Sequence, residues 1–377
     1  MTIMHHDDLN KLLQLKKNAG SHSPSIQSII NTLGYDPVKS DFCYLSNPYA
    51  TKLITNRLIK VLDNEKLVRM IESYPADSTY VSKIFSEIED LNSECIVVGN
   101  GAVQCIEWVC DGWGIEKLLI PKPTFSTYYE LLENKYIFTE ENTVEKNYTS
   151  EDLIREAINK KCDSILIIQP NNPTGSHFEI NQLYELINNS EGLKIIIDDS
   201  FCHYLDNYFE YRKIRNNSNE NVVFIKSLAK DFGVAGVRLG YLYSQDKSLL
   251  EFSRRKTTWN LNNFAITISE ILSDKSLIQE YWKCRKLFIS KKKIFENSLK
   301  SINDLNVYKS MANFFLIQSN IFSEKFVFNF LLDSGMYLRT MADKTGLDET
   351  FIRIAIRSEE ENEICLNELK NYIRKVA

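Results

Sequence analysis

The sequence is short of the features that mark several protein classes. Its apolar runs are no longer than a buried strand, so no membrane span is expected. A net charge of −5 gives no basic excess for binding nucleic acid in general. The eight cysteines form no Cys-x-x-Cys pair and the five histidines lack metal-ligand spacing, so we expect neither disulfides nor a metal site. The N-terminus has no signal-like apolar core, and we expect a cytoplasmic protein.

Strand-like and helix-like stretches alternate from about residue 95 to 245, an order typical of a mostly parallel sheet. The chain length of 377 residues and the 44% apolar content allow a large core and more than one domain. We therefore expect an α/β protein whose residues 45–265 form a large domain, with a mostly parallel central sheet flanked by helices. Residues 1–44 and 266–377 are expected to form a smaller α+β domain. In these end segments the pattern predicts helices at 9–15, 26–33, 265–300, 324–334 and 360–375, and strands at 312–317 and 353–356.

Lys230 stands shortly after the apolar run 222–225, where a strand is expected to end. Burial penalises an ammonium group, and a desolvated lysine can act as an amine nucleophile. Ser227 and Arg238 flank it in a way that suits a bound phosphate. The alternative is a lysine that buries its stem and extends its charge to the surface.

Three further segments place polar groups at the ends of apolar strands. Residues 97–104 run from a strand through glycines into a helical pattern, which aims backbone N–H groups at an anion, although Gly-Asn-Gly is also an ordinary turn. Residues 165–175 end in a stiff proline-flanked turn that carries Asn172. An Ile-rich strand ends in Asp198 and Asp199, and a buried carboxylate there requires a cationic partner.

In this order, the Asn-Pro-Thr-Gly turn, the Ile-rich strand ending in aspartate and the Ser-Leu-Ala-Lys…Arg segment resemble the fold-type I pyridoxal phosphate enzymes, the aspartate aminotransferase superfamily. The likeness extends from about Phe42 to the C-terminus and is strongest to the histidinol-phosphate aminotransferase and threonine-phosphate decarboxylase branch. The resemblance implies an enzyme with pyridoxal 5'-phosphate as its cofactor.

The resemblance also implies roles for individual residues. Lys230 matches the lysine that forms an imine with the cofactor, and Asp198 matches the partner of the protonated pyridine nitrogen. Asn172 matches the residue that hydrogen-bonds the phenolic oxygen. The other cofactor contacts implied are Gly101, Ala102, Val103, Ser227 and Arg238 around the phosphate, Phe125 stacked on the ring, and Tyr74, which would reach the phosphate across the interface of a homodimer with shared active sites.

Several cationic residues near the C-terminus are candidates for binding substrate. Arg353 matches the arginine that binds the α-carboxylate. The segment also contains Arg339, Lys344 and Arg357, which together carry more positive charge than one carboxylate needs. This surplus suits a second anion such as a phosphate. The alternative for Arg357 is a surface ion pair with glutamates at 359–361.

Three positions depart from the family pattern. Phe201 stands where many relatives carry a tyrosine that also touches the phenolic oxygen. Ala229 replaces a frequent serine, and Asp199 replaces a more usual glutamate. None of these changes removes a group that the cofactor chemistry requires, although the imine chemistry could be altered.

The same cofactor residues serve transamination and decarboxylation, so the motifs leave both open. We expect an aminotransferase acting on a small phosphorylated amine or keto substrate with an amino-acid donor. The alternative is a decarboxylase that converts O-phosphoserine or O-phosphothreonine to the amino-alcohol phosphate. Residues 41–51 and 310–314 resemble aminotransferases linked to surface-polysaccharide nucleotidyltransferases, which implies a role in polysaccharide biosynthesis. A non-enzymatic sensing module fused to a DNA-binding domain is disfavoured, because residues 1–44 are too few and not basic enough.

Overall fold

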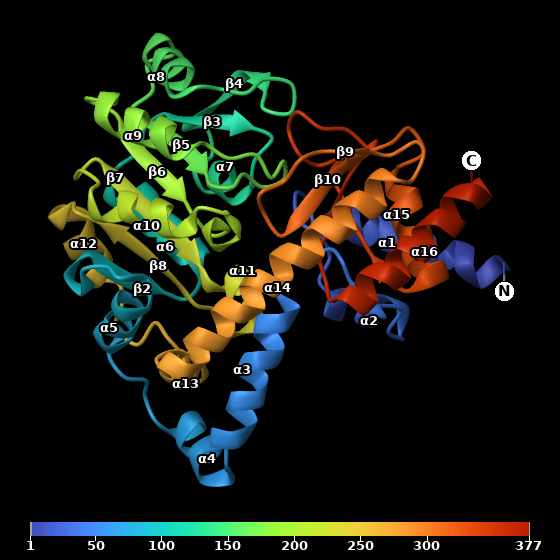
Figure 1. Ribbon diagram of the computed structural model, residues 1–377, viewed down its shortest axis with the longest axis horizontal. Coiled ribbons are helices and arrows are strands. Elements are labelled where there is room, and N and C mark those ends of the chain that lie inside the picture. Colours follow the sequence, from blue (N-terminus) through green and yellow to red (C-terminus); the bar gives the residue numbers. More distant parts are fainter. Residues whose placement is uncertain (1, 377) are drawn as a thin grey trace.

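A seven-stranded sheet forms the centre of the larger part of the computed structural model, which describes residues 2–376 (Figure 1). β8 runs antiparallel to both its neighbours, β2 and β7, whereas the other neighbouring strands are parallel. The predicted α/β class with a mostly parallel sheet is confirmed. The strands, in spatial order, are β2 (Ile96–Gly99), β8 (Gly240–Ser244), β7 (Val222–Ser227), β6 (Lys194–Asp198), β5 (Ser164–Ile168), β3 (Leu118–Lys122) and β4 (Tyr136–Asn142).

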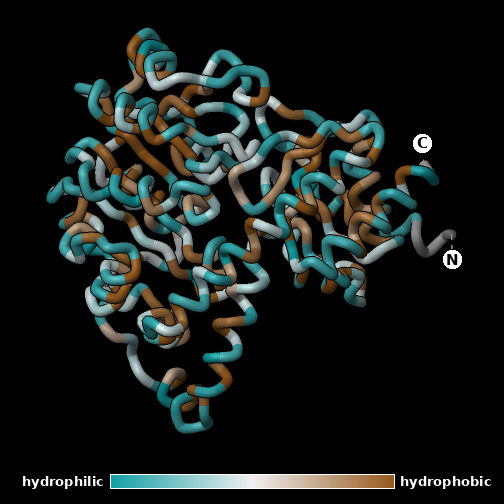
Figure 2. The backbone as a smooth tube through the Cα atoms, in the orientation of Figure 1, coloured by the Kyte–Doolittle hydropathy of each residue, from teal (hydrophilic) through white to brown (hydrophobic). Residues whose placement is uncertain are grey.

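Helices cover both faces of this sheet, which explains why its central strands are almost continuously apolar. In β5, Ile165 and Ile167 pack into the core on one face, while Leu166 and Ile168 pack into the core on the other. Figure 2 shows hydrophobic stretches inside this part and hydrophilic turns around it. The first face is covered by α5 (Ser78–Glu89), α8 (Ser150–Asn159), α9 (Ile180–Asn189) and α10 (Tyr208–Asn216), and the second by α6 (Ala102–Gly112), α7 (Thr127–Leu131) and α12 (Lys247–Arg254).

The two ends of the chain come together in a smaller α+β part, on the right of Figure 1. Its four-stranded antiparallel sheet has the order β12-β13-β10-β9, and a short parallel pair, β1 and β11, lies beside it. The division at 45–265 remains a prediction. The elements of this part are β1 (Ser40–Asp41), β9 (Asn306–Val307), β10 (Phe314–Gln318), β11 (Met336–Tyr337), β12 (Arg339–Thr340), β13 (Phe351–Ala355), α1 (Thr2–Asn18), α2 (Ile26–Leu33), α15 (Glu324–Ser334) and α16 (Glu359–Val376).

The single helix expected over 265–300 is wrong, because the structure has two helices there. α13 (Asn263–Leu272) ends before Ser273, and α14 (Lys275–Lys300) begins after Asp274, whose carboxylate accepts a hydrogen bond from the Ser276 N–H. A capping carboxylate of this kind starts a new helix with a new axis. α14 then crosses from the large core to the core of the smaller part, as Figure 1 shows.

An arm made of α3 (Pro48–Val61) and α4 (Asn64–Glu72) extends away from the rest of the molecule, at the bottom of Figure 1. It exposes large apolar side chains, among them Ile71, which is 80% exposed. Among residues 2–376, no helix is both long enough and apolar enough to cross a membrane. The cytoplasmic location and the homodimer remain predictions.

Candidate active site

A cavity of about 460 Å³ lies where the carboxyl ends of the parallel strands meet the smaller part of the protein. The chain segments that reach it are far apart in the sequence, from Ser21 to Arg353. Most of the residues predicted from the sequence line this cavity: Ala102, Val103, Phe125, Asn172, Asp198, Ser227, Lys230, Arg238, Arg339 and Arg353.

Lys230 lies on α11 (Leu228–Asp231), a single turn that follows β7. Its backbone carbonyl accepts hydrogen bonds from the Tyr204 hydroxyl at 3.0 Å and from the Asn47 N–H at 3.1 Å, which hold the turn in place. Burial, together with the positive charges of Arg353 and Arg238, lowers the pKa of Lys230 to about 8. Its amine is therefore much closer to the neutral, nucleophilic form than an ordinary lysine is.

Asp198 ends β6, the neighbour of β7, and its carboxylate is buried. The Tyr128 hydroxyl donates to Oδ2 at 3.0 Å, and the Ser200 N–H donates to Oδ1 at 3.1 Å. Burial raises the pKa of Asp198, while these hydrogen bonds and the charge of Lys230 act in the opposite direction. The site thus holds a buried acid whose charge requires a cation in the cavity.

The N-terminus of α6 provides the anion-binding end of the cavity. Gly101 has a φ of +85°, and a Cβ added there would lie 2.6 Å from Nη2 of Arg238, so a side chain would displace the guanidinium. Within the described chain, α6 has no side-chain cap, which leaves the N–H groups of its first turn for an anion. Gly240 also allows a close approach, since its added Cβ would lie 2.5 Å from the backbone nitrogen of Ala102.

Arg353 lies on β13 with its guanidinium in the cavity. Nη1 donates to the Asn172 side-chain oxygen and Nη2 to the Cys43 carbonyl, each at 2.7 Å. Its buried Nε has no partner among the described residues. Burial lowers the pKa of Arg353 to about 10, which keeps it cationic at neutral pH. This oriented guanidinium with a free N–H suits a substrate carboxylate.

Arg339 and Lys344 form a second cationic group in the same cavity. Arg339 donates to Asp343 at 2.7 Å and to the Ser21 carbonyl at 3.0 Å, and Lys344 also donates to the Ser21 carbonyl, at 2.7 Å. Burial lowers the pKa of Lys344 to about 8. Sequence reasoning counted Lys344 in the surplus of positive charge that suits a second anion, and the structure places it in this cavity. Sequence reasoning missed Ser21 and His22, which also line the cavity, because no local pattern connects them to the strand ends that carry the other site residues.

The structure does not bring Tyr74 and Arg357 into this cavity. Tyr74 is 77% exposed and packs on Trp259, with the ring centroids 4.6 Å apart. The Nε atom of Arg357 lies 3.3 Å from Oε1 of Glu361, as in the ion pair considered as its alternative. The geometry therefore favours a structural ion pair over a substrate contact for Arg357.

Of the three positions that depart from the family pattern, two lie in the cavity and one lies outside it. Phe201 and Ala229 line the cavity, and the ring of Phe201 packs edge-on against Phe314. Asp199 lies outside the cavity, 3.6 Å from Nη1 of the buried Arg215. Burial raises the pKa of Asp199 to about 7. Of the two adjacent aspartates, Asp198 is the one that faces the cavity.

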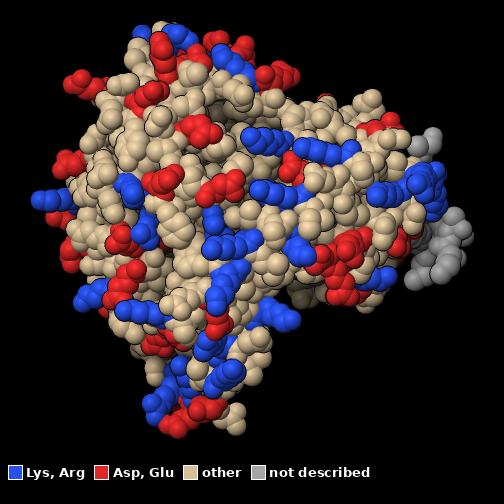
Figure 3. All heavy atoms as spheres, viewed as in Figure 1, with Lys and Arg blue, Asp and Glu red and all other residues tan. Residues whose placement is uncertain are grey.

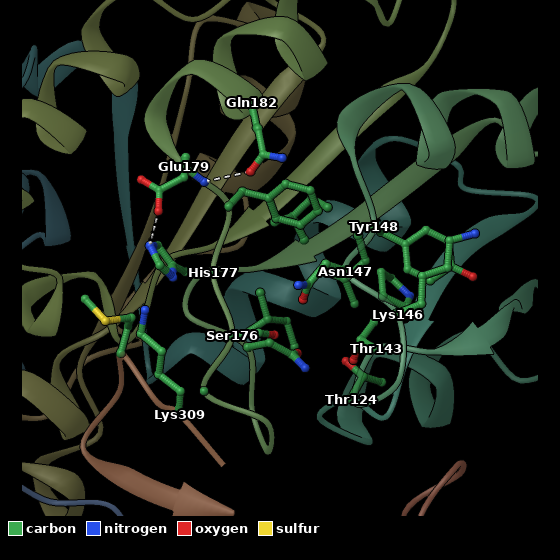
Figure 4. Close-up of a pocket in the computed structure, with 18 residues that line it drawn as sticks. Thr124, Thr143, Lys146, Asn147, Tyr148, Ser176, His177, Glu179, Gln182 and Lys309 are labelled. Carbon is green, nitrogen blue, oxygen red and sulfur yellow. Dashed lines mark hydrogen bonds and ion pairs between the residues drawn. The ribbon is translucent and has the colours of Figure 1, made fainter.

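A second pocket, of about 450 Å³, lies beside the turn that carries Asn172 (Figure 4). It is lined by Asn171 but not by Asn172, and none of the predicted site residues contributes to it. His177 and Lys309 stand on one side of this pocket and Lys146 on the other. It adjoins the candidate active site, with which it shares only Ile168 among the lining residues.

Two decarboxylases and one solved structure show strong similarity to this chain. An L-serine phosphate decarboxylase of Campylobacter jejuni subsp. jejuni is 33% identical over 372 residues, which are 95% of this chain and 95% of that protein. An L-serine phosphate decarboxylase of Sulfurospirillum multivorans is 31% identical over 375 residues, 96% of this chain and 95% of that one. The structure of a decarboxylase from Sulfurospirillum multivorans has a TM-score of 0.89 at 29% identity, and the match covers 98% of this chain and 97% of that one.

Histidinol-phosphate aminotransferases and a threonine-phosphate decarboxylase are similar as well, which confirms the predicted branch. The family model of aminotransferase class I and II matches residues 77–369. The residues present fit pyridoxal phosphate, since the uncapped helix beside Gly101 and Arg238 offers a phosphate cradle, and the buried carboxylate of Asp198 lines the same cavity as Lys230. The chain therefore depends on pyridoxal phosphate and belongs to the aminotransferase class I and II family.

Proposed function

We propose that the protein decarboxylates a phosphorylated amino acid, with O-phospho-L-serine as substrate and O-phosphoethanolamine and carbon dioxide as products. The observation that carries this proposal is the pair Arg339 and Lys344, which adds a second cationic group to the cavity that already contains Arg353. One cationic group can bind the α-carboxylate, and the other can bind the phosphate. A substrate with a single anion would leave the ammonium group of Lys344 with only the Ser21 carbonyl as a hydrogen-bond partner among the described residues.

The similar proteins support decarboxylation over the transamination that we expected from the sequence. Two of them are named L-serine phosphate decarboxylases and match nearly the whole chain. The aminotransferase family model covers both activities of this fold, so it does not favour transamination. The alternative reading of the sequence is therefore the better supported of the two.

The bound cofactor supplies the electron sink for the pair of electrons left at Cα when the carboxylate departs. Gly101, Ala102, Val103, Ser227 and Arg238 would hold its phosphate, Phe125 would lie against its ring, and Asn172 and Asp198 would contact its polar ring substituents. Asp198, held by Tyr128 and Ser200, favours a protonated pyridine nitrogen through its negative charge.

The chain's own residues would then decide which bond at Cα breaks. Arg353 would bind the carboxylate through its free Nε, while Arg339 and Lys344 would bind the phosphate. Two anchored anions would fix the rotation of the substrate about Cα and so select the bond to the carboxylate as the one that breaks. Lys230, with a pKa of about 8, can deliver the proton that replaces the carboxylate at Cα.

The proposed assembly is a homodimer in which Tyr74 serves the partner's cavity. Tyr74 is exposed in its own chain and lies next to an arm with exposed apolar side chains, which typically mark a protein interface. The link to surface-polysaccharide biosynthesis rests on the resemblance of short segments alone and remains a prediction.

The test is to incubate the holoenzyme with O-phospho-L-serine and to measure carbon dioxide and O-phosphoethanolamine together. We expect equal amounts of the two products without any added keto acid. L-Serine, which lacks the phosphate, should be a poor substrate. Formation of a keto acid from an amino donor, in the absence of carbon dioxide release, would favour transamination instead.

A further inference from the structure

A basic cavity of about 350 Å³ lies between α14 and the loop that precedes β10, outside the active site. Figure 3 shows Lys and Arg side chains gathered on the face of the molecule over α14. Four lysines and two acids line the cavity, so positive charge is in excess. The lining residues are Tyr204, Asp206, Ile289, Lys292, Lys293, Glu296, Lys300, Lys309, Ser310 and Met311.

Lys292 is the unusual member of this group, because it is only 7% exposed. Its ammonium group has no hydrogen bond and no ion pair within residues 2–376, and it lies 6.0 Å from the centroid of the Phe315 ring. Of the two acids nearby, Glu296 is already bound to Lys300 at 2.7 Å. Burial lowers the pKa of Lys292 to about 8, although Glu296 and Asp206 act against this shift. A buried cation without a partner is costly, and an anion in the cavity would offset that cost.

We propose that this cavity is a second anion-binding site, which takes the phosphate group of a small metabolite. Lysines act as point charges for phosphate, and several ammonium groups around one cavity suit a dianion better than a single carboxylate. Lys309 and Met311 also line the pocket shown in Figure 4, which has about 450 Å³ of space. An organic group attached to the phosphate can extend into that pocket.

A ligand held there would contact both parts of the protein. Tyr204 packs in the core of the smaller part, and its hydroxyl donates to the backbone carbonyl of Lys230 at 3.0 Å. Met311 precedes β10 and packs against the core of the large part, and its N–H donates to the carbonyl of Gly175 at 2.8 Å, next to the Asn172 turn. The occupant is therefore expected to stabilise the joined parts against unfolding.

The test uses inorganic phosphate and the holoenzyme, with binding followed by isothermal titration calorimetry. Lys292→Met and Lys309→Met should each weaken phosphate binding at this site by about tenfold or more, since each removes one charge. Lys286→Met is the matched control, because Lys286 is an exposed lysine on the same helix and does not line the cavity. Its phosphate affinity should equal that of the wild type.

A Lys344→Met arm separates this site from the active site, because it removes a cation of the active-site cavity alone. Phosphate binding that persists in Lys344→Met and is lost in Lys292→Met supports the second site, whatever the enzyme's substrate is. Phosphate binding that disappears in Lys344→Met, or that is unchanged in both Lys292→Met and Lys309→Met, overturns the proposal. Lys309 is exposed, so its variant remains informative even if Lys292→Met fails to fold.

Thermal unfolding gives a second readout that a purely structural role of Lys292 would not produce. In phosphate-free buffer, Lys292→Met should raise Tm, because it replaces a buried unpartnered cation with an apolar side chain of similar length. Added phosphate should raise the Tm of the wild type more than that of the variant. A variant with lowered Tm and an undiminished response to phosphate would show that Lys292 only supports the fold.

Discussion

Lys230 and Asp198 owe their reactivity to the same physical cause, which is their place at the ends of neighbouring buried strands. The carboxyl ends of the parallel strands β6 and β7 lie at one edge of the sheet, so an acid and an amine that are distant in the sequence come into one cavity. Burial there moves the pKa of Asp198 up and that of Lys230 down. Both shifts arise because burial penalises the charged form of each group. A bound cofactor that carries both a positive and a negative group would reduce this penalty.

The first prediction concerns the pH dependence of cofactor capture by the apoenzyme. The neutral amine of Lys230 is the reactive form, so the capture rate should rise with pH to a plateau above its pKa of about 8. At pH 6 the neutral fraction is about 1%, and capture should be correspondingly slow. Absorbance after mixing measures the rate, and borohydride reduction followed by mass spectrometry locates the attachment.

The control for this prediction is Lys230→Ala, which should bind the cofactor through the phosphate cradle but form no reducible link. A borohydride label on another lysine would contradict the assignment of Lys230. A capture rate that does not change between pH 6 and 8 would contradict the lowered pKa.

The second prediction concerns Tyr128, which was not assigned a role from the sequence. Tyr128→Phe removes the hydroxyl that donates to Asp198 Oδ2 at 3.0 Å, and the pKa of Asp198 should rise further. A hydrogen bond to a charged group is worth roughly 1.5–3 kcal/mol, so kcat should fall by about tenfold or more while the fold persists. Steady-state kinetics measure this effect. Tyr129→Phe, on the same helix but without a bond to Asp198, should be nearly neutral.

The strand pair β12–β13 decides which cations reach the substrate. Arg339 and Arg353 are direct partners in its register, so the two guanidinium groups extend from adjacent positions of one sheet. The loop between the strands returns Lys344 to the same cavity, where the Ser21 carbonyl holds it. Beyond the end of β13, Arg357 instead pairs with Glu361 of α16. Arg353 therefore lines the cavity, whereas Arg357, four residues later in the chain, forms an ion pair outside it.

The third prediction compares Lys344 with Arg357. Lys344→Met should raise the KM for O-phospho-L-serine by about tenfold to a hundredfold, because a charge-assisted contact worth roughly 1.5–3 kcal/mol is lost at ~1.4 kcal/mol per decade. Activity on L-serine, which has no phosphate, should change little. Arg357→Met is the matched control and should leave both values near those of the wild type. If Arg357→Met impaired the phosphorylated substrate and Lys344→Met did not, the second anion site would be misplaced.

At the scale of the whole molecule, the arm of α3 and α4 is the part whose apolar side chains a single chain leaves exposed to water. Exposed apolar side chains on α3 and α4 include Ile59, Val68 and Ile71, and Tyr74 and Trp259 form an exposed aromatic pair beside them. Water contact with so much apolar surface is unfavourable, and burial in a dimer would remove it. This arrangement supports the predicted homodimer.

The fourth prediction tests shared active sites by mixing two inactive variants. Lys230→Ala removes the amine of one chain, and Tyr74→Phe removes a hydroxyl that the partner's cavity is expected to use. If the sites are shared, heterodimers contain one site with both groups intact, so part of the activity should return. Activity is measured after co-refolding, with each variant alone as a control. A fully active monomer in sedimentation analysis would contradict the prediction.

Amino-acid order alone predicts the α/β class, the mostly parallel sheet and the polar groups at the strand ends. These features depend on the order of residues within short segments. Asp198, Asn172 and Lys230 each lie at or just after the end of an apolar strand, and the carboxyl ends of parallel strands lie at one edge of the sheet, whatever the order of the strands. Sequence reasoning misjudged the 265–300 segment, because the capping role of Asp274 competes with an otherwise continuous helical pattern.

The contacts among the remaining polar groups become visible in the folded molecule alone. The hydrogen bond from Tyr128 to Asp198, the contact of Ser21 with Lys344, and the position of Arg357 outside the cavity depend on how segments far apart in the chain pack together. No local pattern encodes such contacts, because the free energy that fixes them comes from burial and charge in the folded molecule. For the same reason, only the structure showed that Lys292 is a buried cation in a basic cavity.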